Sequence, residues 1–167
     1  SQPNVLNGYL IMSSSEFDMQ TTIGTIVPNV FTTMAGFAAN PQKDAPPPER
    51  DRVSGTIGIA GDTVTGAVYV HLPDPLARQI ANAILGNPAD QVVADGDLND
   101  VVGELTNMVG GGLKSALCDA GLRCAMSTPS IIRGAFAIEV PQALRPQVFQ
   151  FNCQGQSFSV EAHLKCA

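Results

Sequence analysis

Two stretches of this 167-residue chain alternate apolar and polar residues on both sides of a glycine-containing turn signal. The first covers residues 53–72 and turns at Gly61-Asp62; the second covers residues 148–164 and turns at Gln154-Gly155. This period of two is typical of antiparallel hairpins that bury one face and leave the other in water. The chain is therefore predicted to form an antiparallel sheet whose apolar face needs a second layer to cover it.

Three other segments repeat apolar residues every three or four positions, which is the spacing of one face of a helix. The first starts at Glu16 and contains Pro28, where we expect a kink or a restart because proline lacks the backbone N–H. A short helix is expected after an Asp74 cap, ending at Gly86. The third helix is expected to start with Asp95 or Asp97 as its cap and to run to about residue 119.

Helices and hairpins occupy separate blocks of the chain, an order that predicts an α+β fold. We expect two layers, with an antiparallel sheet of hairpins covered on one face by helices. The length fits one domain. It is predicted to span residues 16–167, with a Pro-rich loop at 40–52, after a flexible or irregular segment at 1–15.

Charged residues make up only 14% of the chain, and the formal net charge is −6. The nine Lys and Arg residues form no basic cluster, so we expect neither nucleic acid nor an anionic membrane as a partner. No stretch supplies the ~20 apolar residues of a membrane span, and no basic segment precedes an apolar run as in a leader peptide. These features favour a cytoplasmic protein.

Cysteine and histidine give no sign of a metal site. The four cysteines lack the spacing of metal ligands, and we interpret them as reduced thiols that mostly fill the core. His71 and His163 fall on the polar sides of the two hairpins. They are therefore predicted to be surface residues.

The third helix carries the most information about function. At 100° per residue, its residues divide into an apolar side with Leu98, Val102, Leu105, Val109 and Ala116, and an opposite polar stripe with Asp100, Glu104, Asn107 and Gly111. Most polar stripes are simply solvated. Here four glycines lie inside the helix, although each costs about 1 kcal/mol relative to alanine.

Glycine in a helix is useful where another chain or a ligand comes close. We expect Gly103, Gly110 and Gly111 to remove bulk around Glu104 and Asn107, so that a partner can dock there. Gly112 points toward the core side and is expected to permit close packing.

The run Asp100-x-x-x-Glu104-x-x-Asn107, followed by Pro129, resembles the signature of the CheX, CheC and FliY phosphatases of bacterial chemotaxis. The string over 103–111 is most similar to CheX, and residues 30–34 and 127–134 resemble two further blocks of the family. There are departures. The gap between Asn107 and Pro129 is about one residue shorter than the pattern, the acidic-amide motif occurs once rather than twice as in CheC, and the 40–52 loop is longer than is typical.

This resemblance implies a hydrolase that removes the aspartyl phosphate from a phosphorylated CheY-like receiver domain in two-component signalling. Glu104 is then expected to pair with a lysine of the partner and Asn107 to orient the attacking water, while Asp100 docks or simply favours the helix dipole. No cofactor of its own is implied, because Mg²⁺ is supplied by the partner. A homodimer built by strand pairing is also implied.

The residue types suit this chemistry independently. Phosphoryl transfer requires positioning and charge stabilisation more than covalent help. An uncharged carboxamide can both donate and accept hydrogen bonds, and a carboxylate forms a charge-assisted bond with lysine. The alternative is a non-catalytic receiver-binding or flagellar-switch adaptor that keeps the docking helix.

Overall fold

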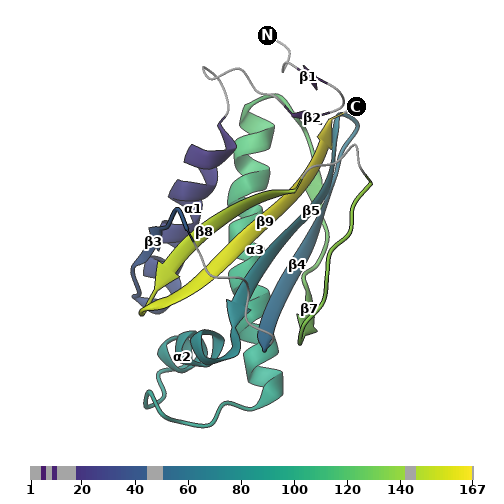
Figure 1. Cartoon of the computed structure of the whole chain (residues 1–167). Coiled ribbons are helices and arrows are strands. Elements are labelled where there is room, and N and C mark those ends of the chain that lie inside the picture. The colour runs from purple at the N-terminus through teal and green to yellow at the C-terminus, as the bar shows by residue number, and fades with distance from the viewer. Residues whose placement is uncertain (1–4, 7–8, 11–17, 45–50, 142–145, 167) are drawn as a thin grey trace.

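The protein is described by a computed structural model that covers residues 5–6, 9–10, 18–44, 51–141 and 146–166. Within these ranges it is an α+β structure, with three helices and one sheet of nine strands. Helices α1 (Met19–Ala35) and α3 (Asp95–Asp119) lie behind the sheet in Figure 1, and α2 (Asp74–Leu85) lies at one end of it. The predicted fold class, with helices over one face of an antiparallel sheet, is confirmed.

The strands are β1 Val5–Leu6, β2 Tyr9–Leu10, β3 Ala39–Pro41, β4 Arg52–Ala60, β5 Val64–Pro73, β6 Ala125–Met126, β7 Ser130–Arg133, β8 Gln147–Cys153 and β9 Gln156–Cys166. They follow the order β1-β2-β9-β5-β4-β6, with β8 beside β9, β3 beside β8 and β7 beside β4. All of these pairs are antiparallel.

Both predicted hairpins are present. In β4–β5 Val53 pairs with Leu72, and in β8–β9 Phe151 pairs with Phe158. Gln154 and Gly155 have φ angles of 53° and 73°, the positive values that a two-residue hairpin turn requires. Turn chemistry and alternation thus agree on one register, which places the apolar side of each hairpin under the helices.

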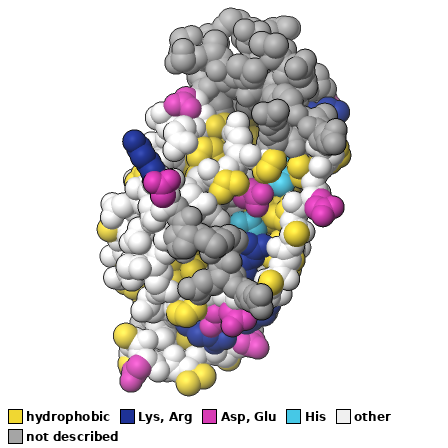
Figure 2. All heavy atoms as spheres, viewed as in Figure 1, with side chains coloured by type: hydrophobic (Ala, Val, Ile, Leu, Met, Phe, Trp, Pro, Cys, Tyr) yellow, Lys and Arg dark blue, Asp and Glu magenta, His cyan; other side chains and the backbone are white. Residues whose placement is uncertain are grey.

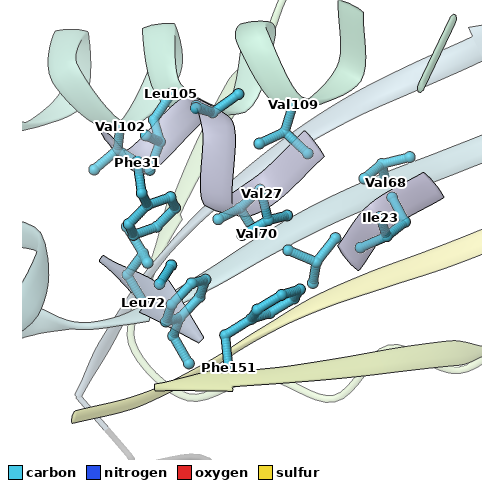
Figure 3. Close-up of a cluster of buried hydrophobic side chains, with 14 of the residues drawn as sticks. Ile23, Val27, Phe31, Val68, Val70, Leu72, Val102, Leu105, Val109 and Phe151 are labelled. Carbon is cyan, nitrogen blue, oxygen red and sulfur yellow. The ribbon is translucent and has the colours of Figure 1, made fainter. Parts of the chain in front are cut away.

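The core lies between this side of the sheet and the helices (Figure 3). Aromatic rings link the layers: Phe31 of α1 stacks on Phe158 of β9 at 4.6 Å, and Phe158 stacks on Phe151 of β8 at 5.3 Å. The members labelled in Figure 3 are all buried: Ile23, Val27, Phe31, Val68, Val70, Leu72, Val102, Leu105, Val109 and Phe151.

The helix ends differ in part from the predictions. The expected start of α1 at Glu16 lies outside the described residues; the helix begins at Met19, where the Asp18 side chain accepts a hydrogen bond from the backbone N–H of Gln20. The helix continues through Pro28 without a restart. Asp74 is the first residue of α2 rather than its cap.

The start of α3 also corrects a prediction. Neither Asp95 nor Asp97 caps the helix, because both lie in its first turn; Ala94 occupies the cap position, without a side-chain hydrogen bond. Gly86 ends α2 as expected, with φ 69° and its N–H bonded to the carbonyl of Asn82.

Two segments predicted to be irregular contain short strands. Within residues 1–15, β1 and β2 are paired, and Tyr9 lies opposite Lys165 of β9; the rest of this segment lies outside the described residues. In the Pro-rich loop, Asn40 and Pro41 belong to β3, which pairs with β8. Residues 45–50 of that loop lie outside the described part.

The prediction that His71 and His163 are surface residues is wrong. Their exposed fractions are 5% and 6%, although they lie on the face of the sheet turned away from the helices. The ring of Phe136, which follows β7, lies 5.8 Å from that of His71 and covers it. Figure 2 shows histidine side chains on this face, beside acidic and basic side chains.

Candidate docking site on helix α3

The outer side of α3 carries the predicted polar residues. Asp100 and Glu104 are exposed, Asn107 is half-buried, and Met108, directly after Asn107, is 41% exposed. The opposite side of the helix faces the sheet, where Leu98, Val102, Leu105 and Val109 are all fully buried. The amphipathic spacing thus sets which side of α3 meets solvent.

Close packing fixes α3 against β4. Thr106 is fully buried, and its hydroxyl donates to the carbonyl of Val102 at 2.7 Å. It faces Gly55 of β4, where a Cβ would overlap the Thr106 side chain. One turn further on, a Cβ on Gly110 would lie 2.9 Å from Ile57 Cγ2. Asn107 is therefore held between two points where the helix and the strand almost touch.

Pro129, the last residue of the motif, directly precedes β7 and lies beside α3. A Cβ on Gly103 would lie 3.7 Å from Pro129 Cγ and 4.0 Å from Ile131 Cδ1. Pro129 and β7 therefore lie along the flank of α3, level with Glu104. The fold thus brings Pro129 to the level of Glu104, although the two residues are 25 positions apart in the sequence.

The glycines correct part of the sequence prediction. Gly103 and Gly110 are buried, so neither clears the outer side of α3. The missing side chain of Gly110 lets α3 approach β4, whereas a Cβ on Gly103 would make an ordinary contact with Pro129. Gly111 is half-buried, and a Cβ there would lie 3.8 Å from Met126 Cε. Gly112 faces Ile26 of α1, where a Cβ would lie 3.0 Å from Ile26 Cγ2; its expected role in packing is confirmed.

The outward residues form what we call the α3 stripe: Asp100, Glu104, Asn107, Met108 and Gly111. The stripe is acidic at its N-terminal end, where negative charge is favourable to the helix dipole. Among the described residues, neither Asp100 nor Glu104 takes part in an ion pair. Their carboxylates can therefore accept hydrogen bonds from a cationic side chain of another molecule.

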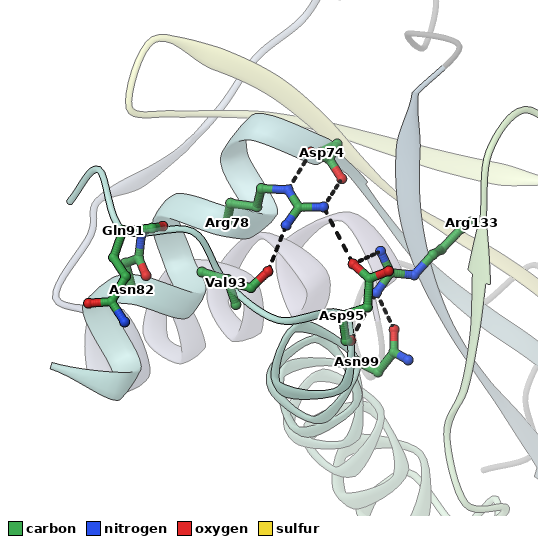
Figure 4. Close-up of polar contacts among 8 residues, drawn as sticks. All are labelled: Asp74, Arg78, Asn82, Gln91, Val93, Asp95, Asn99 and Arg133. Carbon is green, nitrogen blue, oxygen red and sulfur yellow. Dashed lines mark hydrogen bonds and ion pairs between the residues drawn. The ribbon is translucent and has the colours of Figure 1, made fainter. Parts of the chain in front are cut away.

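The first turn of α3 is held by two arginines (Figure 4). Arg133 of β7 lies 3.3 Å from Asp95 Oδ1, and Arg78 of α2 lies 3.7 Å from the same oxygen. Asp95 thus pairs with arginines of the same chain although its side chain is 77% exposed, whereas Asp100 and Glu104 form no ion pair among the described residues. The helical spacing of the sequence does not predict which of these carboxylates forms an ion pair.

A second polar cluster lies on the other face of the sheet. Ser54 Oγ is 2.7 Å from His71 Nδ1, and His71 Nε2 is 2.9 Å from Glu161 Oε2. Serine, histidine and a carboxylate in a row suggest a hydrolase triad. Ser54, however, is fully buried, so no substrate can reach its hydroxyl, and the cluster is structural.

The charge of Glu161 is set by its neighbours. Burial alone would raise the pKa of this carboxyl, but the hydrogen bond from His71 and the ion pairs with His71 and His163 bring the pKa below its ordinary value. His163 Nε2 lies 3.0 Å from Glu161 Oε1. Alternation predicted that His71 and His163 lie on this face of the sheet, but it does not show what covers them.

In the described part of the chain, no three His, Cys, Asp or Glu side chains are grouped so as to hold a metal ion. Of the helices in that part, none has the length and apolar character to cross a membrane.

A family model described as chemotaxis phosphatase CheX matches residues 53–152 of the chain. The chain belongs to the CheX family. The matched region includes all of α3 and Pro129, so the α3 stripe lies inside the part that defines the membership. No curated protein sequence is significantly similar to the chain.

Solved structures agree with this membership. The chemotaxis protein CheX from Vibrio vulnificus is 28% identical, with a TM-score of 0.75 over 92% of this chain and 100% of that one. The CheX from Desulfovibrio desulfuricans is 27% identical, with a TM-score of 0.73 over 90% and 100%. A CheX–CheY–BeF3–Mg²⁺ complex from Borrelia burgdorferi has the same fold at 16% identity, with a TM-score of 0.68 over 89% and 98%.

Proposed function

We propose that this CheX-family protein is a hydrolase that accelerates loss of the aspartyl phosphate from a CheY-like response regulator. The observation that carries the proposal is the α3 stripe, which turns a carboxylate and a carboxamide outward on one rigidly packed helix. Two findings support it: the family is described as a chemotaxis phosphatase, and a solved complex pairs a protein of this fold with CheY.

Glu104 is proposed to dock the partner. Its carboxylate is exposed, has no ion-pair partner among the described residues, and lies on the third turn of a helix whose beginning is acidic. A lysine beside the phosphoryl group of the receiver can donate charge-assisted hydrogen bonds to it. Such a pair fixes orientation, because the bond is strong only when the two groups are aligned.

Asn107 is proposed to orient the attacking water. Its amide has both a donor and an acceptor and carries no charge, so it can hold a water in line with the phosphorus without repelling the phosphate. Packing of Thr106 on Gly55 and of Gly110 on Ile57 keeps the Asn107 backbone in place. Mg²⁺, which neutralises phosphoryl charge in such reactions, is proposed to be held by the partner and not by this chain.

Asp100, Met108 and Gly111 are proposed to complete the docking surface. Asp100 adds a second carboxylate one turn before Glu104, and Met108 adds an exposed apolar side chain one turn after it. Gly111 leaves room beside Met126 for an incoming side chain. Gly103 and Gly110 are left out because they are buried.

The decisive experiment measures the lifetime of phosphoaspartate on a receiver domain labelled with acetyl phosphate, with and without this protein. We expect the lifetime to shorten, and Asn107→Ala to lose about a hundredfold of the acceleration, since misplaced reactants cost on this order. Ser115→Ala is the control, because Ser115 is a polar residue exposed on α3, two turns further on. An unchanged lifetime with retained binding would instead identify the adaptor.

We also propose a homodimer formed by strand pairing. β7 pairs with β4 from Ser130 to Arg133, and no strand covers its other side within the described residues. Unpaired backbone groups at a sheet edge can pair with a second chain. Light scattering should give about twice the 17.4 kDa mass of one chain; a monomer mass throughout the micromolar range would contradict the dimer.

A further inference from the structure

Arg133, the last residue of β7, ties this strand to the beginning of α3 with three hydrogen bonds (Figure 4). Nη1 donates to Asp95 Oδ1 at 3.3 Å, and Nη2 donates to the Asp95 carbonyl at 3.0 Å and to Asn99 Oδ1 at 2.6 Å. The planar guanidinium group can make such divergent bonds at once, which a lysine cannot. A single side chain therefore holds two successive turns of the helix.

The beginning of α3 depends on such contacts. The cap position holds Ala94, whose side chain cannot accept the hydrogen bonds of the first turn. Gly96 and Gly103 lie within the first ten residues, and glycine weakens a helix because it loses the most backbone freedom on folding. The end of the helix that presents Asp100 and Glu104 is thus its intrinsically weak end.

The weak end is held on both flanks. On one side, Arg78 of α2 donates to the Val93 carbonyl at 3.0 Å, pairs with Asp74 at 2.7 Å and approaches Asp95 at 3.7 Å. On the other side lies β7, with Arg133 at the first two turns. The same strand region meets the helix again where Pro129 and Ile131 pack beside Gly103.

We infer that Arg133 is a positioning residue that keeps Asp100 and Glu104 aligned for the partner. The inference rests on the proposed function, because it assigns Arg133 a part in docking. Asn99, which Arg133 binds, directly precedes Asp100, and Glu104 directly follows Gly103 on the same flank. Asn107 is held separately, by contacts of its neighbours with β4.

Because Arg133 supports the docking residues and not Asn107, its loss is expected to change KM and not kcat. Arg133→Met, which keeps the length of the side chain but makes no hydrogen bonds, should raise KM for the phosphorylated receiver about tenfold. It should leave kcat within about twofold, because Asn107 keeps its support. Arg133→Lys retains the charge without the fork and should give a smaller rise in KM, of about threefold.

Arg123→Met is the matched control. Arg123 is exposed beyond the other end of α3, and its loss changes the net charge by the same amount. A similar rise in KM for both methionine variants would show that only net charge matters and would overturn the inference. An unchanged KM in Arg133→Met would overturn it as well.

Hydrogen exchange separates this inference from the proposed function. In Arg133→Met the amides of residues 98–104 should exchange at least about fivefold faster, while those of 106–110 keep their wild-type rates, because only the first turns lose support. Unchanged exchange at 98–104 would overturn the inference. If the wild-type protein fails to shorten the lifetime of phosphoaspartate, the proposed function falls, while the exchange result still decides whether Arg133 holds these turns.

Discussion

Gly110 of α3 lies so close to Ile57 of β4 that a Cβ on the glycine would be 2.9 Å from the Ile57 Cγ2 atom. The distance is shorter than side chains tolerate, so the glycine sets how closely the helix carrying the α3 stripe approaches the sheet. The cost of glycine in a helix, about 1 kcal/mol relative to alanine, is offset by this packing.

Gly110→Ala should therefore destabilise the protein, by about 1–3 kcal/mol as for other overpacked cores. Gly96→Ala is the matched control in the same helix, because a Cβ there meets no atom within 4 Å; it should stabilise by about 0.5 kcal/mol. Urea unfolding followed by circular dichroism measures both. Equal effects of the two substitutions would show that Gly110 has no packing role.

Glu104→Lys should weaken binding to the phosphorylated receiver about tenfold or more, because it places a cation opposite the proposed lysine of the partner. The fold should be retained, since Glu104 is exposed. Asp62→Lys makes the same change of charge at the exposed turn between β4 and β5 and should bind as the wild type does. Fluorescence anisotropy at two salt concentrations is the measurement; equal losses in both variants would count against a specific contact.

Met108→Ala tests the apolar part of the docking surface. Met108 is 41% exposed, and an exposed methionine in an interface loses its contact area when truncated. We expect the affinity for the receiver to fall about threefold to tenfold, with little change in melting temperature. Val148→Ala, at a 49% exposed position on β8, is the control and should leave affinity unchanged. A loss of affinity in Val148→Ala but not in Met108→Ala would show that the receiver binds the sheet and not α3.

Glu161 makes stability depend on pH. Its pKa is lowered in the folded protein despite burial, because His71 and His163 stabilise the charged form. The folded state therefore gains stability above the unfolded pKa of about 4.3, and this gain is lost as the pH falls through the lower folded value. In Glu161→Gln the fall in free energy of unfolding between about pH 5 and pH 3 should be shallower. Denaturant titrations across this range measure it, and an unchanged slope would contradict the assignment.

Alternation and turn chemistry were sufficient to predict the hairpins and the side of the sheet that the helices cover. In 53–72 both signals specify the same register, because a slip of one residue would expose Val68 and Val70. Helical spacing likewise predicted that Glu104 faces outward. These features are local, and each is fixed by residues a few positions apart.

Features that depend on distant segments were missed. His71 is buried because Phe136 comes over the outer face of the sheet, and the segment after β7 has no periodicity that could predict this. Gly110 lies at the margin of the polar stripe on a helical wheel, and only the position of Ile57 decides that it is buried. The two-residue strands β1 and β2 are too short to leave a pattern.

The tight seating of α3 limits how this protein can change its partner. Inward positions such as Val102 and Thr106 are fully buried, and a Cβ on Gly110 would lie only 2.9 Å from Ile57 of β4. If the α3 stripe is the docking surface, we expect a lineage that adapts to a different partner to vary its outward side chains, chiefly Asp100 and Met108, while the inward side chains of the helix stay the same.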